Sequence, residues 1–242
     1  MNDTATKRLS VTHGDPATIV EFTNPAAKNV MDDVMIGELH AVLDASDDRK
    51  VLVFRGRGDG FSAGRPHSPG GHPGGPEAAR KALNDVVRLN LRVGKWKAPT
   101  VALVHGYAHG AALGLIQQCD IALAERGTVV SFPEITYHLP PGLVASYLRR
   151  CVSEKAARYL VMSGRQVDAV RAREMGLISD VVEPGTLHAA GDALIGELAA
   201  RIEAEIWLKE SLAKFNPWQG DLDTLMEQGV GTVFAWGARN KK

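Results

Sequence analysis

The sequence predicts an α/β fold, in which strand–strand–helix units repeat along the chain and lead into a largely helical C-terminal region. Three observations support this prediction. Short apolar runs typical of strands recur through the first three quarters of the 242 residues. Glycine-containing turns follow several of these runs. From Gly142 onward, apolar residues recur mainly at helical spacing.

The apolar runs place the expected strands at residues 18–22, 51–55, 100–104, 120–124, 129–132 and 178–182. The run from Val51 is apolar at four successive positions, which is typical of a strand covered on both faces. Asn29 is expected to cap a first helix, because asparagine is a favoured N-cap residue. Further helices are expected at residues 77–93, 142–150, 153–162, 168–175 and 186–212, with a short one ending near Cys119.

The segment from Phe61 to Pro76 is too rich in glycine and proline for regular structure. No change of composition marks a linker. We place a soft boundary near Pro184, which divides the chain into a core at residues 1–184 and a helical region at residues 185–242.

Composition excludes several function classes. The 28 Lys and Arg residues equal the 28 Asp and Glu residues, so no net charge favours nucleic acid or an anionic membrane. No apolar run approaches the roughly 20 residues that span a bilayer. The first ten residues are polar and lack a signal-peptide core, so a cytoplasmic location is expected. Cys119 and Cys151 have no metal or redox spacing and are expected to be free thiols.

Two glycine-containing turns, each just after an apolar run, are the first candidate site. They read FSAGR at residues 61–65 and HGYAHGAA at residues 105–112. Such turns expose backbone N–H groups, and two converging donors are what a developing thioester enolate oxyanion requires. Taken alone, the spacing favours two ordinary tight turns, because isolated glycine turns are weak signals of function.

Four segments in order resemble the enoyl-CoA hydratase/isomerase (crotonase) superfamily. They are VLVFRGRGDGFSAGR, KAPTVALVHGYAHGAALGLIQQCDIALA, SFPEITYHLPPG and LVMSGRQVDAVRAREMGLISDVVEP. The resemblance runs from about Thr18 to Val182. It implies a crotonase-like spiral fold, with a thioester-binding core at residues 1–184. It also implies that residues 185–242 serve in oligomerisation and pocket closure.

By this resemblance, the oxyanion donors are the backbone N–H groups of Arg65 and Ala111, and Glu134 is the proton-transfer residue. A carboxylate beside an acyl carbon transfers protons well once it is partly desolvated. Without the motif, Glu134 would be an ordinary exposed loop residue. The remaining expected substrate-binding residues surround these three: Ala63, Gly64, His67, His109, Gly110, Gly114, Tyr137 and His138.

The histidines leave other roles open. His67 and His72 are too few to hold a metal without nearby carboxylates or cysteines, so no metal site is expected. His109, His138 and Tyr137 are candidates for an acid, a base or a substrate clamp, and a packing role is the alternative for each.

Gly114 departs from the family pattern, because hydratases with two carboxylates carry a second glutamate at the matching position. Hydration benefits from one group on the water and one on the carbon. The departure favours isomerisation over ordinary hydration. If the pocket has room, Gly114→Glu is expected to raise hydration. Hydrolysis, decarboxylation, carbon–carbon cleavage and a non-catalytic binding role remain alternatives on the same scaffold.

The resemblance also implies the partners. An acyl-CoA is the expected substrate, with an acyl-carrier-protein thioester as the alternative, and no separate cofactor is expected. Relatives form trimers or pairs of trimers, so a homotrimer or dimer of trimers is expected here.

Overall fold

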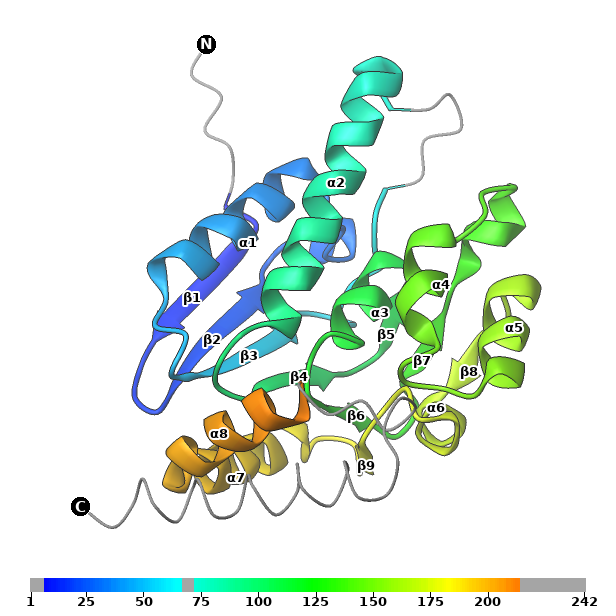
Figure 1. The fold of residues 1–242 in the computed structure, drawn as a ribbon. Helices are drawn as coiled ribbons and strands as arrows, with labels where there is room; N and C mark the ends of the chain where they lie inside the picture. Colours follow the sequence, from blue (N-terminus) through cyan, green and yellow to red (C-terminus); the bar gives the residue numbers. More distant parts are fainter. Residues whose placement is uncertain (1–6, 67–71, 214–242) are drawn as a thin grey trace, which may run out of the picture.

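The computed structural model describes residues 7–66 and 72–213. Its centre is a six-stranded sheet of order β1-β2-β3-β4-β6-β9 (Figure 1). β1 and β2 are antiparallel, and every other neighbouring pair in this sheet is parallel. Its strands are β1 Leu9–His13, β2 Ala17–Phe22, β3 Val51–Gly56, β4 Thr100–Val104, β6 Ile121–Glu125 and β9 Asp180–Val182. A smaller sheet of order β5-β7-β8 contains β5 Tyr107–His109, β7 Val129–Ser131 and β8 Val167–Asp168.

Helices follow the strands in the predicted alternation and dominate after residue 142. They are α1 Asp33–Ala45, α2 Gly75–Gly94, α3 Ala111–Ile116, α4 Gly142–Leu148, α5 Glu154–Ser163, α6 Ala169–Met175, α7 Leu187–Ala200 and α8 Ile202–Leu212, with the 3-10 turns η1 Pro25–Ala27 and η2 Pro133–Tyr137. The predicted α/β class with a helical C-terminal part is confirmed. In the described part of the chain, no helix has both the length and the apolarity to cross a membrane. Cys119 and Cys151 are free thiols, as predicted.

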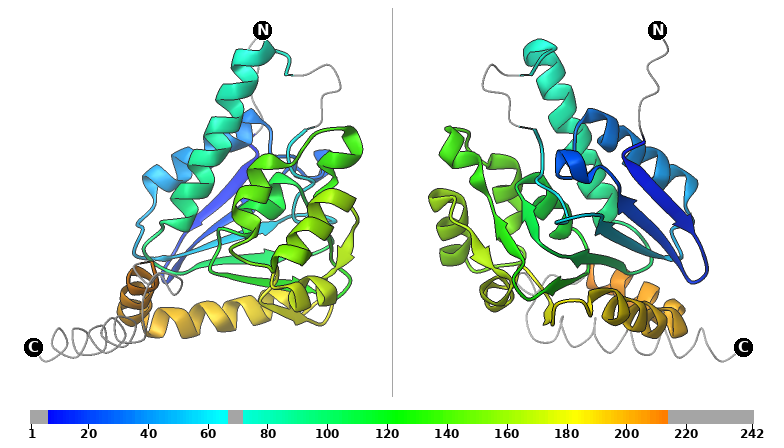
Figure 2. Two further views of the ribbon diagram at one scale, coloured as in Figure 1. Left: turned by 45° about the vertical axis from the view of Figure 1, so that its right-hand side comes forward. Right: turned by 180° about the vertical axis from the view of Figure 1, so that it is seen from behind.

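β3 divides the core into two. Leu52 and Phe54 pack into a cluster with residues of α1 and α2, whereas Val51 and Val53 pack with Leu187 and other residues of α7. Figures 1 and 2 show α7 and α8 on the opposite side of the main sheet from α1. These four side chains are buried, which confirms the prediction of a strand covered on both faces. The division of the chain at Pro184 stays a prediction.

The predicted start of the first helix was wrong. α1 begins at Asp33, and the Asp32 carboxylate caps it by accepting a hydrogen bond from the Met35 N–H at 2.9 Å. Val34, in the first turn of α1, is 44% exposed. Asn29 instead has a left-handed backbone, with φ of 50°, and its side chain is buried in the preceding loop. Asparagine adopts this conformation more readily than most residues. This property favours Asn29 at a left-handed position in the loop over the predicted N-cap position.

Short or local features account for the other differences. β1, β5 and β8 were not predicted, and β5 and β8 have only three and two residues. The single helix predicted at 186–212 is interrupted at Arg201, whose φ of −130° ends α7 before α8 begins.

Asn29 provides a test of how the loop is held. Its Nδ2 donates to the carbonyl oxygens of Arg57 at 2.9 Å and Gly60 at 3.0 Å, and its Oδ1 accepts from the Asn24 N–H at 3.0 Å. Asn29→Ala should lower the free energy of unfolding by about 2–3 kcal/mol, because it leaves buried backbone groups unpaired. Asn84→Ala, at an exposed position of α2, is the control and should change it by less than about 0.5 kcal/mol. Equal effects in urea unfolding would contradict this role for Asn29.

Candidate active site

The two glycine turns lie directly against each other. Ser62 forms a parallel bridge with Ala108, and the His109 N–H donates to the Ser62 carbonyl at 3.1 Å. A Cβ atom at Gly64 would lie 2.3 Å from the carbonyl oxygen of His109 and 3.2 Å from the amide nitrogen of Ala111. Gly64 also has φ of 81°. Only glycine fits this position, and its small size brings the first turn against the start of α3.

The structure brings together the two predicted backbone donors, Arg65 and Ala111, at this contact. Within residues 7–66 and 72–213, neither N–H donates to another group. Ala111 is the first residue of α3 and has negative φ, so its methyl group is compatible with the turn. The Arg65 guanidinium is engaged elsewhere: it donates to the Met31 carbonyl at 3.0 Å and pairs with Asp33 at 2.7 Å.

Hydrogen bonds from the loop after η1 hold the first glycine turn, at residues 61–65, in place. The Ser62 hydroxyl donates to the Asn29 carbonyl at 2.7 Å and accepts from the Gly64 N–H at 3.0 Å. The Ala63 N–H donates to the Lys28 carbonyl at 3.0 Å, and the Gly64 carbonyl accepts from Met31 at 2.9 Å. These bonds use the neighbouring backbone groups and leave the Arg65 N–H available. Ala63 and Gly64 thus shape the site through their backbone.

Glu134 lies over the second turn. It stands in η2, just after β7, and a Cβ atom at Gly110 would lie 2.6 Å from its Oε1. Gly110 has φ of 53°, so both its backbone and its close contact with the carboxylate require glycine. The Oε2 atom is buried and has no hydrogen-bond partner among the described residues. Burial raises the pKa of Glu134, an effect partly offset by a hydrogen bond from its own backbone N–H.

Position 114 is filled by a neighbour, which the sequence did not indicate. A Cβ atom at Gly114 would lie 2.9 Å from the Tyr147 Oη and 3.1 Å from the Val144 Cγ1. The Tyr147 hydroxyl accepts a hydrogen bond from the Nδ2 of Asn90 at 2.7 Å. The structure therefore has no room for a glutamate at 114 unless Tyr147 moves. The condition attached to Gly114→Glu, that the pocket has room, is therefore met only if Tyr147 is displaced.

The remaining predicted residues are more dispersed. His109 bonds to the Ser131 hydroxyl through Nδ1 at 2.9 Å and stacks on Tyr107, so its ring is held within the sheet. Burial, with a smaller contribution from the charge of Lys28, lowers the pKa of His109 and so favours its neutral form. Tyr137 is 50% exposed, and His138 is exposed at the end of η2. His67 lies outside the described residues.

Asn90 and Tyr147 are the polar residues near this site that sequence reasoning missed. Each belongs to an amphipathic helix, and neither lies in a distinctive motif. Their contact depends on α2 and α4 both packing against α3. Local sequence therefore carries no signal for it.

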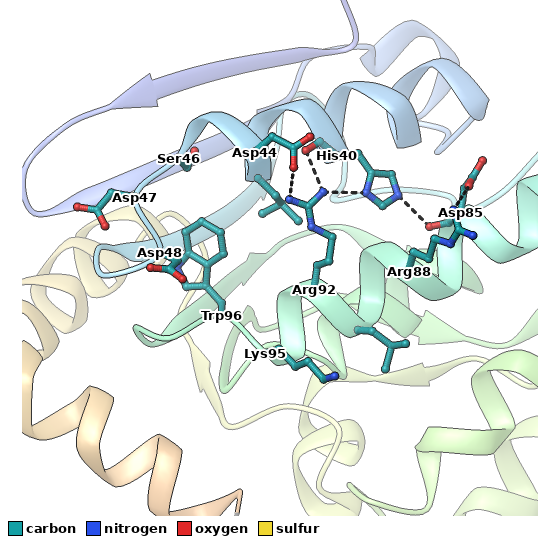
Figure 3. A pocket seen from close by; sticks show the side chains of 12 residues that line it. His40, Asp44, Ser46, Asp47, Asp48, Asp85, Arg88, Arg92, Lys95 and Trp96 are labelled. Carbon is teal, nitrogen blue, oxygen red and sulfur yellow. Dashed lines mark hydrogen bonds and ion pairs between the residues drawn. The ribbon is translucent and has the colours of Figure 1, made fainter.

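A separate groove lies between α1 and α2, away from Glu134 (Figure 3). Its volume is about 890 Å³, and several of its charged side chains pair with one another. Arg92 bonds to Asp44 at 2.6 Å and to the His40 ring at 3.1 Å, and the other ring nitrogen of His40 contacts the Asp85 carbonyl at 3.0 Å. None of the predicted site residues lines this groove. No group of three or more metal-ligating side chains occurs among the residues that the structure describes.

Comparison with known proteins identifies the family of this chain. The sequence signature described as Enoyl-CoA hydratase/isomerase matches residues 15–217. A Thermus thermophilus protein of enoyl-CoA hydratase type is 30% identical over 208 residues, covering 84% of this chain and 82% of the relative. The 2,3-dehydroadipyl-CoA hydratase of Escherichia coli is 30% identical over 182 residues, covering 72% and 68% of the two chains. A Thermobifida fusca protein solved in complex with CoA has a TM-score of 0.84 at 25% identity, covering 96% of this chain and 93% of that one.

The signature spans the parallel strands, both glycine turns and the Glu134 segment, and it continues through the described C-terminal helices. The fold and the ordered motifs thus agree over most of the chain. On this basis, the chain belongs to the enoyl-CoA hydratase/isomerase family of the crotonase superfamily.

Proposed function

We propose that this protein acts on an acyl-CoA thioester, stabilises its enolate with the N–H groups of Arg65 and Ala111, and moves a proton between carbons with Glu134. The observation that carries the proposal is the position of Glu134. Its carboxylate lies against Gly110, next to the Ala111 N–H, with one buried oxygen unpartnered among the described residues. A base that contacts the residue preceding an oxyanion donor is suited to removing a proton next to a thioester carbonyl.

In this mechanism, the thioester oxygen accepts hydrogen bonds from the Arg65 and Ala111 N–H groups. Glu134 takes a proton from the acyl chain, the C–H electrons move into the enolate, and the oxygen gains negative charge. The two N–H groups stabilise that charge. Glu134 then returns the proton to another carbon of the same chain, which shifts the double bond. Partial desolvation raises the basicity of its carboxylate, which favours the first step.

Coenzyme A is the proposed carrier of the acyl group. The Thermobifida fusca relative that was solved with CoA supports this choice. The backbone of Ala63, Gly64 and Gly110 is proposed to line the acyl site, because Gly64 lies at the contact between the two turns and Ala63 and Gly110 flank that contact in the sequence. Isomerisation is proposed over hydration, because position 114 offers no second carboxylate to activate water.

A panel of acyl-CoA esters tests the reaction. A 3-enoyl-CoA should convert to the 2-enoyl isomer with a shifted absorbance and no change of mass, whereas crotonyl-CoA should gain water very slowly. Glu134→Gln keeps the shape of the side chain but removes the base. It should lower the isomerisation rate by about 10² to 10⁴-fold with little effect on folding.

The exposed Glu210 provides the matched control, and Glu210→Gln should retain the wild-type rate. Because the pKa of Glu134 is raised, the wild-type rate should increase with pH over a range above that of an ordinary carboxyl. Rapid hydration of crotonyl-CoA, or full activity of Glu134→Gln, would reject the single-carboxylate proposal.

The oxyanion donor is tested separately by Ala111→Pro. Proline is tolerated at the first position of a helix, so α3 should persist while the N–H is lost. Losing one such donor should lower the rate by about 10² to 10³-fold. Ala111→Gly retains the N–H and should stay near the wild-type rate. Normal turnover by a Pro variant with an unchanged circular dichroism spectrum would place the oxyanion elsewhere.

We also propose a trimer-based assembly. In α8, the side chains of Leu208 and Leu212 are 48% and 57% exposed. Contact with another copy of the chain would bury this apolar surface. Light scattering at micromolar concentration should give a mass about three times the 26.0 kDa of the chain, or a multiple of that. A species of single-chain mass alone would contradict the assembly.

A further inference from the structure

The peptide group between Gly64 and Arg65 carries one of the two proposed oxyanion donors, and its orientation decides where that N–H points. A trans peptide is planar, so its C=O and N–H point in opposite directions. The Gly64 carbonyl accepts from the Met31 N–H at 2.9 Å, which fixes one side of this plane. The Arg65 N–H, on the other side, has no acceptor within residues 7–66 and 72–213. A bond made by residue 31 thus sets the direction of the donor.

The two donors differ in how much regular structure supports them. Ala111 is the first residue of α3, and the Gly110 N–H before it donates to the Ser131 carbonyl of β7 at 2.9 Å. Arg65 belongs to no helix or strand. Backbone of this kind is more mobile than the elements it connects, unless other bonds restrain it. The first donor therefore depends on contacts made by its own loop and side chain.

The Arg65 guanidinium returns to the segment that fixes this peptide. Its Nη1 donates to the Met31 carbonyl at 3.0 Å, and its Nη2 pairs with the Asp33 Oδ1 at 2.7 Å. A planar guanidinium is suited to engaging two acceptors at once. Together with the bond from Met31 to Gly64, these contacts close a ring between residues 31–33 and residues 64–65. The side chain of Arg65 thereby restrains the peptide that carries its N–H.

Asp33 is itself held from a second side. Its Oδ2 bonds to the His72 Nε2 at 2.9 Å, and the His72 Nδ1 accepts from the Gly74 N–H at 3.1 Å. Because Nδ1 accepts, the ring proton lies on Nε2 and is donated to the carboxylate. Burial opposes the shift, but the hydrogen bonds from His72 and Arg65 outweigh it and lower the pKa of Asp33. The carboxylate is therefore charged at neutral pH, with one oxygen oriented by His72 and the other on Arg65.

We propose that Asp33 is a positioning residue, which acts through the Arg65 guanidinium to hold the Gly64–Arg65 peptide with its N–H directed at the thioester oxygen. This inference rests on the proposed function, which assigns that oxygen to the Arg65 N–H. Without Asp33, the N–H is still present but is less well aligned. Poor alignment weakens stabilisation of the charged enolate more than binding of the uncharged thioester.

Steady-state isomerisation of a 3-enoyl-CoA tests this role. Asp33→Ala should lower kcat about tenfold and change KM by less than about twofold, because the donor is misaligned rather than lost. Arg65→Met keeps the backbone N–H and a long side chain but lacks the guanidinium, so it should lower kcat by a similar factor. The double variant should be no slower than Arg65→Met alone, because Asp33 acts only through Arg65. Asp44→Ala is the matched control: it breaks another ion pair of α1, with Arg92 at 2.6 Å, and should keep the wild-type kcat.

The outcomes separate this inference from the proposed function. A wild-type kcat in folded Asp33→Ala or Arg65→Met, or losses that multiply in the double variant, would overturn the role of Asp33 and leave the proposed function standing. An equal loss in Asp44→Ala would also overturn it, since breaking any ion pair of α1 would then suffice. A wild-type protein that converts no 3-enoyl-CoA overturns the proposed function and this inference with it. Thermal unfolding establishes that each variant is folded. If Asp33→Ala does not fold, Asp33→Ser takes its place, because serine suits a helix start but is too short to reach Arg65.

Discussion

The close approach of two backbone turns is the contact on which the rest of this site depends. Gly64 lies so near His109 and Ala111 that no side chain fits, and its positive φ excludes most other residues as well. The contact brings together, at the end of β5, the N–H groups of Arg65 and Ala111, which have no acceptor among the described residues. Ser62, Asn29 and the Lys28 carbonyl then hold the first turn in place through hydrogen bonds. The site is thus built chiefly from backbone, which explains why an arginine and an alanine are acceptable at 65 and 111.

The same principle governs the side chains above α3. Gly110 and Gly114 leave its face bare at two positions one turn apart, and Glu134 and Tyr147 occupy the space over them. Holding a carboxylate there is unfavourable, since one of its oxygens is buried with no partner in the described part of the chain and the pKa of Glu134 is raised. Asn90 is similarly half satisfied. Such groups reduce stability and are retained where binding or chemistry uses them.

The sequence predicted those features that local pattern determines. The apolar run at residues 51–55 identified a doubly covered strand, and the glycine motifs identified two turns that the structure brings into contact. The role of these turns as oxyanion donors stays a prediction. The Asn29 prediction failed because cap preference is local, whereas its real partners are carbonyls about thirty residues away. Tyr147 could not be predicted, because its place over Gly114 depends on how three helices pack. The sequence showed that position 114 lacks the glutamate of two-carboxylate hydratases. It did not show that Tyr147 occupies the space beside Gly114.

The central claim is that Glu134 and the two turns generate an enolate, and exchange of the protons next to the thioester measures this most directly. Butyryl-CoA incubated with the protein in deuterium oxide has no double bond to shift or hydrate, so exchange reports only enolate formation. The account predicts that the wild type incorporates deuterium at the second carbon, detected by mass spectrometry, and that Glu134→Gln does so at least about 10²-fold more slowly. Butyryl-CoA that binds to the wild-type protein yet gains no deuterium would contradict it.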